Sequence, residues 1–173
     1  MIYTLTLLYA HPISQPSTRS AKLPKWSPKT LFLKEYEALG LFLSGHPFDQ
    51  YREDCPHICS GSIASVVGGL QKPAKGEDVW RNARDVSLAG LLTDIRKRGN
   101  RVTMFLDDGQ DRIELTMFSE AFQKFRHLIE EHGLRVVSGK IRYDDFIGGW
   151  RLAVKDIKDI DRVIEQRASH LTI

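Results

Sequence analysis

The stretch RVTMFLDDGQDRIELTMF, residues Arg101–Phe118, decides the fold. On both sides of its centre, apolar and polar side chains alternate with the period of two that is typical of strands with one buried face. The apolar positions are Val102, Met104, Leu106, Ile113, Leu115 and Met117. Asp108-Gly109 lies between the two runs and tolerates the positive φ of a tight turn. The sequence therefore predicts strands over 101–107 and 112–118, joined as a β-hairpin.

Patterns around this hairpin extend it into a small domain. A β-rich run at 86–95 precedes it. An amphipathic helix over 119–131, capped by its first residue and closed by Gly133, follows it. Two more strands are predicted at 134–143 and 150–157. The order strand, strand, strand, helix, strand, strand predicts an OB-fold, a mainly β, five-stranded Greek-key barrel with a helix between strands 3 and 4.

The part of the chain before the barrel has a helical pattern. Ser27 is a natural N-cap and Pro28 suits the first helical position. We expect Gly45-His46-Pro47 to end this helix, and a short second helical piece to run from Phe48 to Asp54. The predicted division is an irregular leader (1–22), a helical connector (23–67), a linker (68–85), an OB-fold domain (86–158) and a C-terminal helix (159–173).

Composition limits the class of protein. Hydrophobic residues make up 42% and charged residues 27% of the 173 residues, as in a folded globular chain. No run approaches the about 20 apolar residues that span a bilayer, and Met1–Ala10 lacks the basic flank of a signal peptide. We therefore expect a cytoplasmic protein without a membrane partner. The net charge of +3, from 25 basic and 22 acidic residues, is too small to identify a nucleic-acid partner.

Two groups of residues carry the ligand types of metal sites. Asp107, Asp108 and Asp111 lie around the predicted turn, and Cys55 and Cys59 bracket a histidine. The aspartates lack the remaining ligands of a calcium loop, so a turn explains them better. A single C-x3-C without a second pair is a weak zinc signal, and ordinary reduced thiols explain it better. We expect no metal, no cofactor and no catalytic residue.

A nucleic-acid face is the stronger candidate. Cations interleaved with aromatic rings suit single strands, because cations contact phosphates and rings stack on bases. On the outer face of strands 2 and 3 and in the loop before them, the candidate binding residues are Arg96, Lys97, Arg98, Arg101, Phe105, Arg112 and Phe118. The alternative is that Phe105 and Phe118 pack under a helix or a neighbouring domain. The loop between strands 4 and 5 offers Tyr143, Phe146 and Trp150, but also Asp144 and Asp145, which would repel phosphate.

Several motifs resemble one family. EALGLFLSGHPF (37–48), LAGL (88–91), KRGNR (97–101), LDD (106–108) and RIE (112–114) occur in this order. VVSGK (136–140), YDDF (143–146) and DID (159–161) follow. Together, over 23–173, they resemble the bacterial DNA polymerase III alpha subunit, the C-family replicative polymerase, in its OB-fold region and the helical connector before it. Residues 1–22 do not resemble the family, and the loop between strands 1 and 2 is shorter than is usual there.

The resemblance implies an OB-fold domain that lies near the single-stranded template of a DNA-directed DNA polymerase, a nucleotidyltransferase. The catalytic aspartates of that family would lie upstream, so this chain is expected to be a fragment that is inactive by itself. Its expected partners are single-stranded DNA, bound weakly, and other parts of the polymerase III holoenzyme. Two alternatives remain: a free-standing OB module that binds RNA or tRNA, and a protein-interaction module with outward aromatic residues.

Overall fold

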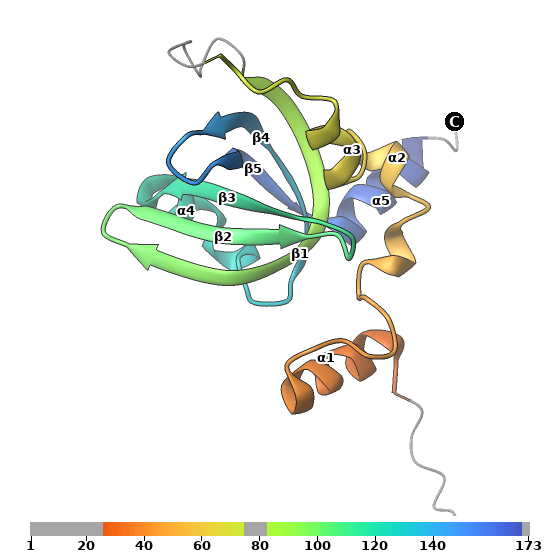
Figure 1. Ribbon diagram of the computed structural model, residues 1–173. Coiled ribbons are helices and arrows are strands. Elements are labelled where there is room, and N and C mark those ends of the chain that lie inside the picture. Colours follow the sequence, from red (N-terminus) through yellow and green to blue (C-terminus); the bar gives the residue numbers. More distant parts are fainter. Residues whose placement is uncertain (1–25, 75–82, 171–173) are drawn as a thin grey trace, which may run out of the picture.

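A computed structural model describes residues 26–74 and 83–170. Five strands form a closed barrel in the order β1-β2-β3-β5-β4, with helix α4 between β3 and β4 (Figure 1). The strands are β1 (Arg84–Arg98), β2 (Arg101–Asp107), β3 (Arg112–Phe118), β4 (Leu134–Asp144) and β5 (Gly149–Asp159). This arrangement confirms the predicted OB-fold.

Two features of the pairing close the barrel. All neighbouring strands are antiparallel except β3 and β5, which pair in parallel. The long strand β1 pairs with β4 through Arg84–Leu91 and with β2 through Leu91–Arg98, so it belongs to both halves of the sheet. Close approach of β4 and β5 requires Gly139, because a Cβ there would lie 2.1 Å from the Ala153 carbonyl oxygen.

The predicted hairpin is confirmed residue by residue, since β2 and β3 span 101–107 and 112–118. The other strands are longer than predicted, above all β1, which runs over 84–98 instead of 86–95. Leu88 and Leu92 of β1 point into the barrel, while Ala89 and Leu91 pack in a second core outside it. A strand that is buried on both faces does not alternate, so its ends are not marked in the sequence.

Helix α1 (Pro28–Leu39) begins as predicted and ends earlier. The Ser27 side chain accepts a hydrogen bond from the Thr30 N–H, and Pro28 occupies the first turn. Gly40 has a φ of 72° and donates its N–H to the Tyr36 carbonyl, which makes it the C-cap. The predicted end at 45–47 is therefore wrong, because the left-handed cap at Gly40 stops the helix first.

Two other helical predictions need correction. The piece expected over 48–54 is only the single 3-10 turn η1 (Asp49–Tyr51). Helix α4 ends at Phe125 and continues as the 3-10 turn η2 (Arg126–Leu128), and its N-cap is Phe118 rather than Ser119. The short helices α2 (Cys55–Ile58) and α3 (Ile63–Gly68) are too brief to leave a period in the sequence. Helix α5 (Ile160–His170) lies within the predicted C-terminal helix of 159–173, whose last three residues are outside the described residues. The expected leader over 1–22 lies outside the described residues.

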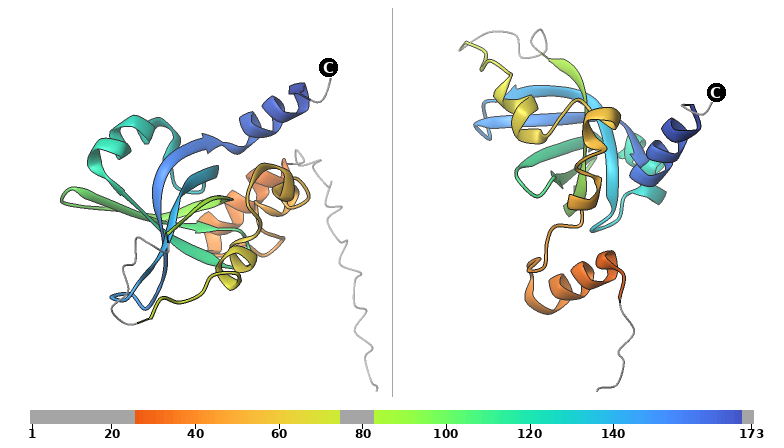
Figure 2. Two further views of the ribbon diagram at one scale, coloured as in Figure 1. Left: turned by 90° about the horizontal axis from the view of Figure 1, so that it is seen from above. Right: turned by 90° about the vertical axis from the view of Figure 1, so that its right-hand side faces the viewer.

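Two hydrophobic cores share the barrel wall. The interior core joins inward side chains of all five strands to Ile63 of α3 and Phe125 of α4. The second core lies on the outer side of β1 and β4, where Phe48 and Cys55 of the connector and Ile160 of α5 cover the wall. Figure 2 shows the connector and α5 on the same side of the barrel. The outer face of β2 and β3 therefore remains uncovered by either core.

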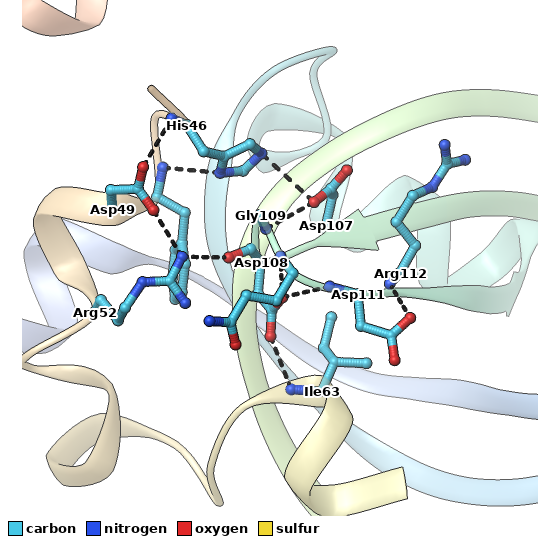
Figure 3. A network of polar contacts seen from close by, with 11 residues as sticks. His46, Asp49, Arg52, Ile63, Asp107, Asp108, Gly109, Asp111 and Arg112 are labelled. Carbon is cyan, nitrogen blue, oxygen red and sulfur yellow. Dashed lines mark hydrogen bonds and ion pairs between the residues drawn. The ribbon is translucent and has the colours of Figure 1, made fainter. Parts of the chain in front are cut away.

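One carboxylate fastens the connector to the barrel (Figure 3). Asp108 is 1% exposed and accepts hydrogen bonds from the Ile63 N–H (2.8 Å), the Gln110 N–H (3.0 Å) and the Asp111 N–H (2.9 Å). The last two shape the β2–β3 turn, and the first holds the start of α3. Arg52 adds a second link, because its guanidinium donates to the Asp108 carbonyl oxygen at 3.1 Å.

His46 packs against the same turn. Its Nδ1 accepts the Phe48 N–H at 3.2 Å, and its Nε2 lies 3.5 Å from Asp107 Oδ1. A Cβ at position 109 would lie 2.9 Å from the imidazole, and the φ of Gly109 is 82°, so glycine serves both the turn and this contact. Burial lowers the pKa of His46, although Asp107 and Asp49 act in the opposite direction.

We predict that Asp108→Ala destabilises the protein by about 3 kcal/mol, because it leaves the buried Ile63 N–H and two part-buried turn N–H groups without their charged acceptor. Urea denaturation followed by circular dichroism measures this loss. Asp145→Ala, which removes an exposed aspartate, serves as the matched control and should change stability by less than about 0.5 kcal/mol. Equal midpoints for the two variants would contradict the role of Asp108.

We also predict that stability falls as the pH drops below about 6.5, the ordinary pKa of histidine. The pKa of His46 is lower in the folded chain, so in this range the unfolded chain binds a proton that the folded chain does not. Urea midpoints at pH about 7.5 and about 5.5 measure the slope, and His46→Gln should flatten it. An unchanged slope in that variant would show that other groups cause the pH dependence.

Candidate nucleic-acid interface

The structure divides the seven predicted binding residues into two groups. Five of them lie at the end of the β1–β2 hairpin and beside it on β3, and we call them the tip cluster: Arg96, Lys97, Arg98, Arg101 and Phe118. Cα pairing places Arg98 opposite Arg101 and Arg101 opposite Phe118. Phe118 is 63% exposed. The sequence expectation of cations next to an outward ring is therefore realised here.

Most cations of the tip cluster have no acidic partner. Arg96 lies 3.8 Å from Asp94, at the limit of an ion pair. Among the described residues, Lys97, Arg98 and Arg101 have no carboxylate oxygen within 4.0 Å. Unpaired cations on a hairpin end attract phosphate without first having to release a carboxylate.

The other two predicted residues, Phe105 and Arg112, form a stacked pair. The Arg112 guanidinium carbon lies 4.7 Å from the centroid of the Phe105 ring. One Nη of Arg112 also contacts Asp94 at 3.2 Å. Phe105 is half-buried, so its ring is partly covered from solvent. This group offers the plane of a guanidinium, rather than a free ring, as a surface on which a base can stack.

Asp94 forms ion pairs with one residue of each group, and the sequence analysis did not identify it. The β1–β2 register shifts between Thr93 and Arg96, and Asp94 lies in this bulge with a φ of 54°. There its carboxylate reaches both Arg96 and Arg112. A bulge redirects side chains locally, which alternation alone does not reveal.

Arg151 is a second residue that the sequence did not single out. Its side chain is only 10% exposed and forms ion pairs with Glu114 (2.8 Å) and Asp144 (2.6 Å). Glu114 lies between Phe105 and Arg151 in the strand register. Two carboxylates therefore share one cation beside the outer face, and Arg151 offsets one of their two negative charges.

The candidate metal residues have structural explanations. Asp107 and Asp108 shape the turn through hydrogen bonds with the Gly109, Gln110 and Asp111 N–H groups, as the turn interpretation expected. The Cys59 thiol donates to the Cys55 carbonyl oxygen at 2.8 Å, and burial raises the pKa of the Cys55 thiol to about 12. Within residues 26–74 and 83–170, no group of three His, Cys, Asp or Glu side chains is arranged to hold a metal ion. No described helix is long and apolar enough to cross a membrane.

Comparison with known proteins connects this geometry to a family. Residues 86–160 match the OB-fold nucleic acid binding domain. The chain is 34% identical over 158 residues to DNA polymerase III subunit alpha of Escherichia coli O157:H7, and the alignment covers 88% of this chain and 13% of that protein. The chain is homologous to part of the DNA polymerase III alpha subunit.

A second alpha subunit, from Xylella fastidiosa (strain Temecula1), is 30% identical over 155 residues, covering 86% of this chain and 13% of the relative. The chain thus spans about an eighth of the length of these relatives. Among solved structures, Pyrococcus horikoshii asparaginyl-tRNA synthetase is 19% identical, with a TM-score of 0.39 over 45% of this chain and 20% of that chain. That superposition is too partial to support a functional comparison. The resemblance drawn from the GHP connector and the barrel motifs to the alpha subunit is confirmed.

We predict that the two outer phenylalanines differ in their effect on stability. Phe105→Ala should cost about 2 kcal/mol, less than the about 3–5 kcal/mol of a fully buried ring. Phe118→Ala should stay within about 0.5 kcal/mol of the wild type, because its ring already faces solvent. Thermal midpoints of both variants test this difference. A larger loss for Phe118→Ala would show that its ring is packed in solution.

Proposed function

We propose that this chain binds single-stranded DNA through the outer face of β2 and β3, as the OB-fold portion of a polymerase III alpha subunit. The observation that carries the proposal is the tip cluster, in which unpaired Arg98 and Arg101 lie beside the exposed ring of Phe118 in adjacent strands. Single strands need both elements, one for phosphates and one for bases. The two groups lie one after the other on this face. The cations of the tip cluster lie at one end, and the stacked pair of Phe105 and Arg112 lies further along.

The distance between the two groups suits an extended strand. Arg101 and Phe105 are four residues apart on β2, which at about 3.3 Å per residue is about 13 Å. A strand that crosses this face therefore meets the tip cluster first and the Arg112 guanidinium a few nucleotides later. In this proposal Arg96, Arg98 and Arg101 contact phosphate, Phe118 stacks on a base, and Arg112, held over the Phe105 ring, offers its guanidinium plane to a second base. Lys97 pairs opposite the inward-facing Val102 and lies 6.0 Å from the Phe122 ring, so it contacts phosphate from the other side of the hairpin.

The polymerase relatives give the context of this binding. Since the homologous proteins are DNA polymerase III subunits, we infer a role in DNA replication, in the bacterial cytoplasm, next to other parts of such a polymerase. The part proposed for this chain is binding alone, without nucleotidyl transfer by its own residues. The chain would hold the strand on which another part of the polymerase acts.

The test is fluorescence anisotropy with a labelled oligonucleotide of about 16 nucleotides, the upper end of the site size of one OB-fold. Arg101→Ala should weaken binding and reduce the slope of log K against log salt by about 0.7, as expected for one lost phosphate contact to a single strand. Phe118→Ala should weaken binding about five-fold or more, because stacking contributes at least about 1 kcal/mol per base.

Arg167→Ala is the matched control, because Arg167 is an exposed cation on α5, on the side of the barrel opposite the β1–β2 hairpin (Figures 1 and 2). It should leave the affinity unchanged. Duplex DNA of the same sequence should bind less tightly, since its bases are already stacked. Equal binding of duplex and single strand, or unchanged affinity in both tip variants, would overturn the proposal. Tighter binding of an RNA of the same sequence would favour the RNA-binding alternative.

A second candidate function is contact with another protein through the connector. Trp26, Leu39, Leu41 and Leu43 are exposed there, and these are four of the seven large hydrophobic side chains exposed in the described residues. Clustered exposed apolar side chains are typical of protein contacts. Salt separates the two functions, because binding through these side chains does not weaken as salt rises, whereas phosphate contacts do.

A further inference from the structure

Asp94 has a backbone conformation that few residues adopt. Its φ is 54°, and among the described residues His132 is the only other residue besides glycine with a positive φ. Left-handed backbone costs free energy for most side chains, and aspartate and asparagine tolerate it best. Residues in sparsely populated conformations are common at functional sites. The role of this aspartate therefore follows from what its side chain contacts.

The bulge reverses the direction in which residue 94 points. Leu92 packs in the interior core, so an unbroken strand would turn Thr93 outward and residue 94 inward. The register instead advances three residues along β1 but only two along β2 at this point. The Asp94 side chain is 44% exposed, and Ile95 packs against the interior core in its place. The bulge thus brings a carboxylate to the outside of the barrel while an apolar side chain keeps the inward position.

Contacts from another part of the chain hold the bulge in place. The Ile95 N–H donates to the Glu131 carboxylate at 2.8 Å. The Leu92 N–H donates to the Gly133 carbonyl oxygen at 2.9 Å, and the Leu92 carbonyl oxygen accepts the His132 N–H at 2.8 Å. These partners belong to the segment between η2 and β4. The position of Asp94 is therefore determined by the fold around it.

The carboxylate of Asp94 contacts one cation from each group of the candidate interface. Its Oδ2 lies 3.2 Å from an Nη of Arg112, and its Oδ1 lies 3.8 Å from an Nη of Arg96. The three side chains are between 44% and 64% exposed. Ion pairs that are this exposed are weak, so a phosphate can displace the carboxylate. Asp94 thus occupies a position that a phosphate of a bound strand would otherwise take.

The neighbouring carboxylates have other partners. Asp94, Asp49 and Asp107 line a cavity of about 510 Å³ between the connector and the barrel. Asp49 pairs with Arg52 of the connector at 2.6 Å, and Asp107 accepts the Gly109 N–H within the turn at 2.7 Å. Of these three aspartates, Asp94 is the one whose partners are cations of the candidate interface.

We propose that Asp94 is an internal competitor of phosphate, which lowers the affinity of the outer face for single strands. It offsets part of the charge of Arg96 and Arg112, so fewer counterions are released when a strand binds. Lower affinity results mainly in faster release, which suits a protein that moves along its strand. This inference rests on the proposed function and deepens it by assigning the residue that regulates the affinity.

The experiment measures Asp94→Asn in the full chain with the oligonucleotide used above. Asparagine keeps the size of the side chain and tolerates the positive φ, but it removes the charge. At about 0.1 M salt the affinity should rise about three-fold or more. The slope of log K against log salt should become steeper by about 0.7, as expected for one additional phosphate contact.

Two further variants serve as controls. Asp94→Gly also removes the carboxylate and suits a positive φ, so it should raise the affinity as Asp94→Asn does. Asp85→Asn breaks the exposed pair of Asp85 with Lys140 on the same strand. It should change affinity less than about 1.5-fold, because it lies about 30 Å away along β1, beyond the screening length of about 10 Å at 0.1 M salt. Equal gains in Asp85→Asn and Asp94→Asn, or weaker binding by Asp94→Asn, would overturn the proposal.

A double-mutant cycle shows whether Asp94 acts through its two partners. In a chain that carries both Arg96→Gln and Arg112→Gln, Asp94→Asn should no longer make the salt slope steeper, because the cations that it would release are absent. The same gain in both backgrounds would show that the carboxylate repels the strand directly, and the competitor role would then be wrong.

The outcomes also separate this inference from the proposed function. If Arg101→Ala and Phe118→Ala weaken binding while Asp94→Asn behaves like Asp85→Asn, the binding face stands and the role of Asp94 is wrong. If only the two Asp94 variants bind a single strand at about 50 mM salt, the competitor role holds and binding by the wild-type chain is wrong. If neither the wild type nor these variants bind, both proposals fall.

Discussion

The buried carboxylate of Asp108 is the contact on which the arrangement of this molecule depends. It accepts N–H groups from the β2–β3 turn and from the first residue of α3, which lies 45 residues earlier in the chain. A carboxylate that is 1% exposed is stable only when such donors surround it. The turn and the connector therefore satisfy the same group, and neither can move without leaving a buried charge poorly solvated.

This contact determines which face of the barrel is free. With α3 fixed at the turn, Phe48 and Cys55 of the connector lie over the outer side of β1 and β4, where Ile160 of α5 joins them. The outer surface of β2 and β3 stays outside this core and carries charged and aromatic side chains instead. The position of the candidate binding face is thus a consequence of where the connector packs.

The sequence predicted all five strands, and most precisely the two that are buried on one face only. Strands β2 and β3 alternate throughout, so their ends were predictable to the residue. Strand β1 has Leu88 in one core and Leu91 in the other, which removes the alternation that would have marked its length. The helix end at Gly40 was missed because Gly45, with Pro47 two residues after it, gave the stronger local signal.

The ion pairs of the site could not be predicted from the sequence. Arg112 and Arg101 occupy equivalent outward positions at the ends of β3 and β2, yet only Arg112 has a carboxylate partner, because the bulge in β1 turns Asp94 toward it. Arg151 of β5 lies beside both Asp144 and Glu114 and offsets one of their two negative charges. Both pairings join residues from different strands, so local composition does not contain them. The net charge of +3 consequently says little about binding. What matters is that the cations without carboxylate partners gather at the β1–β2 hairpin, next to a ring that no core covers.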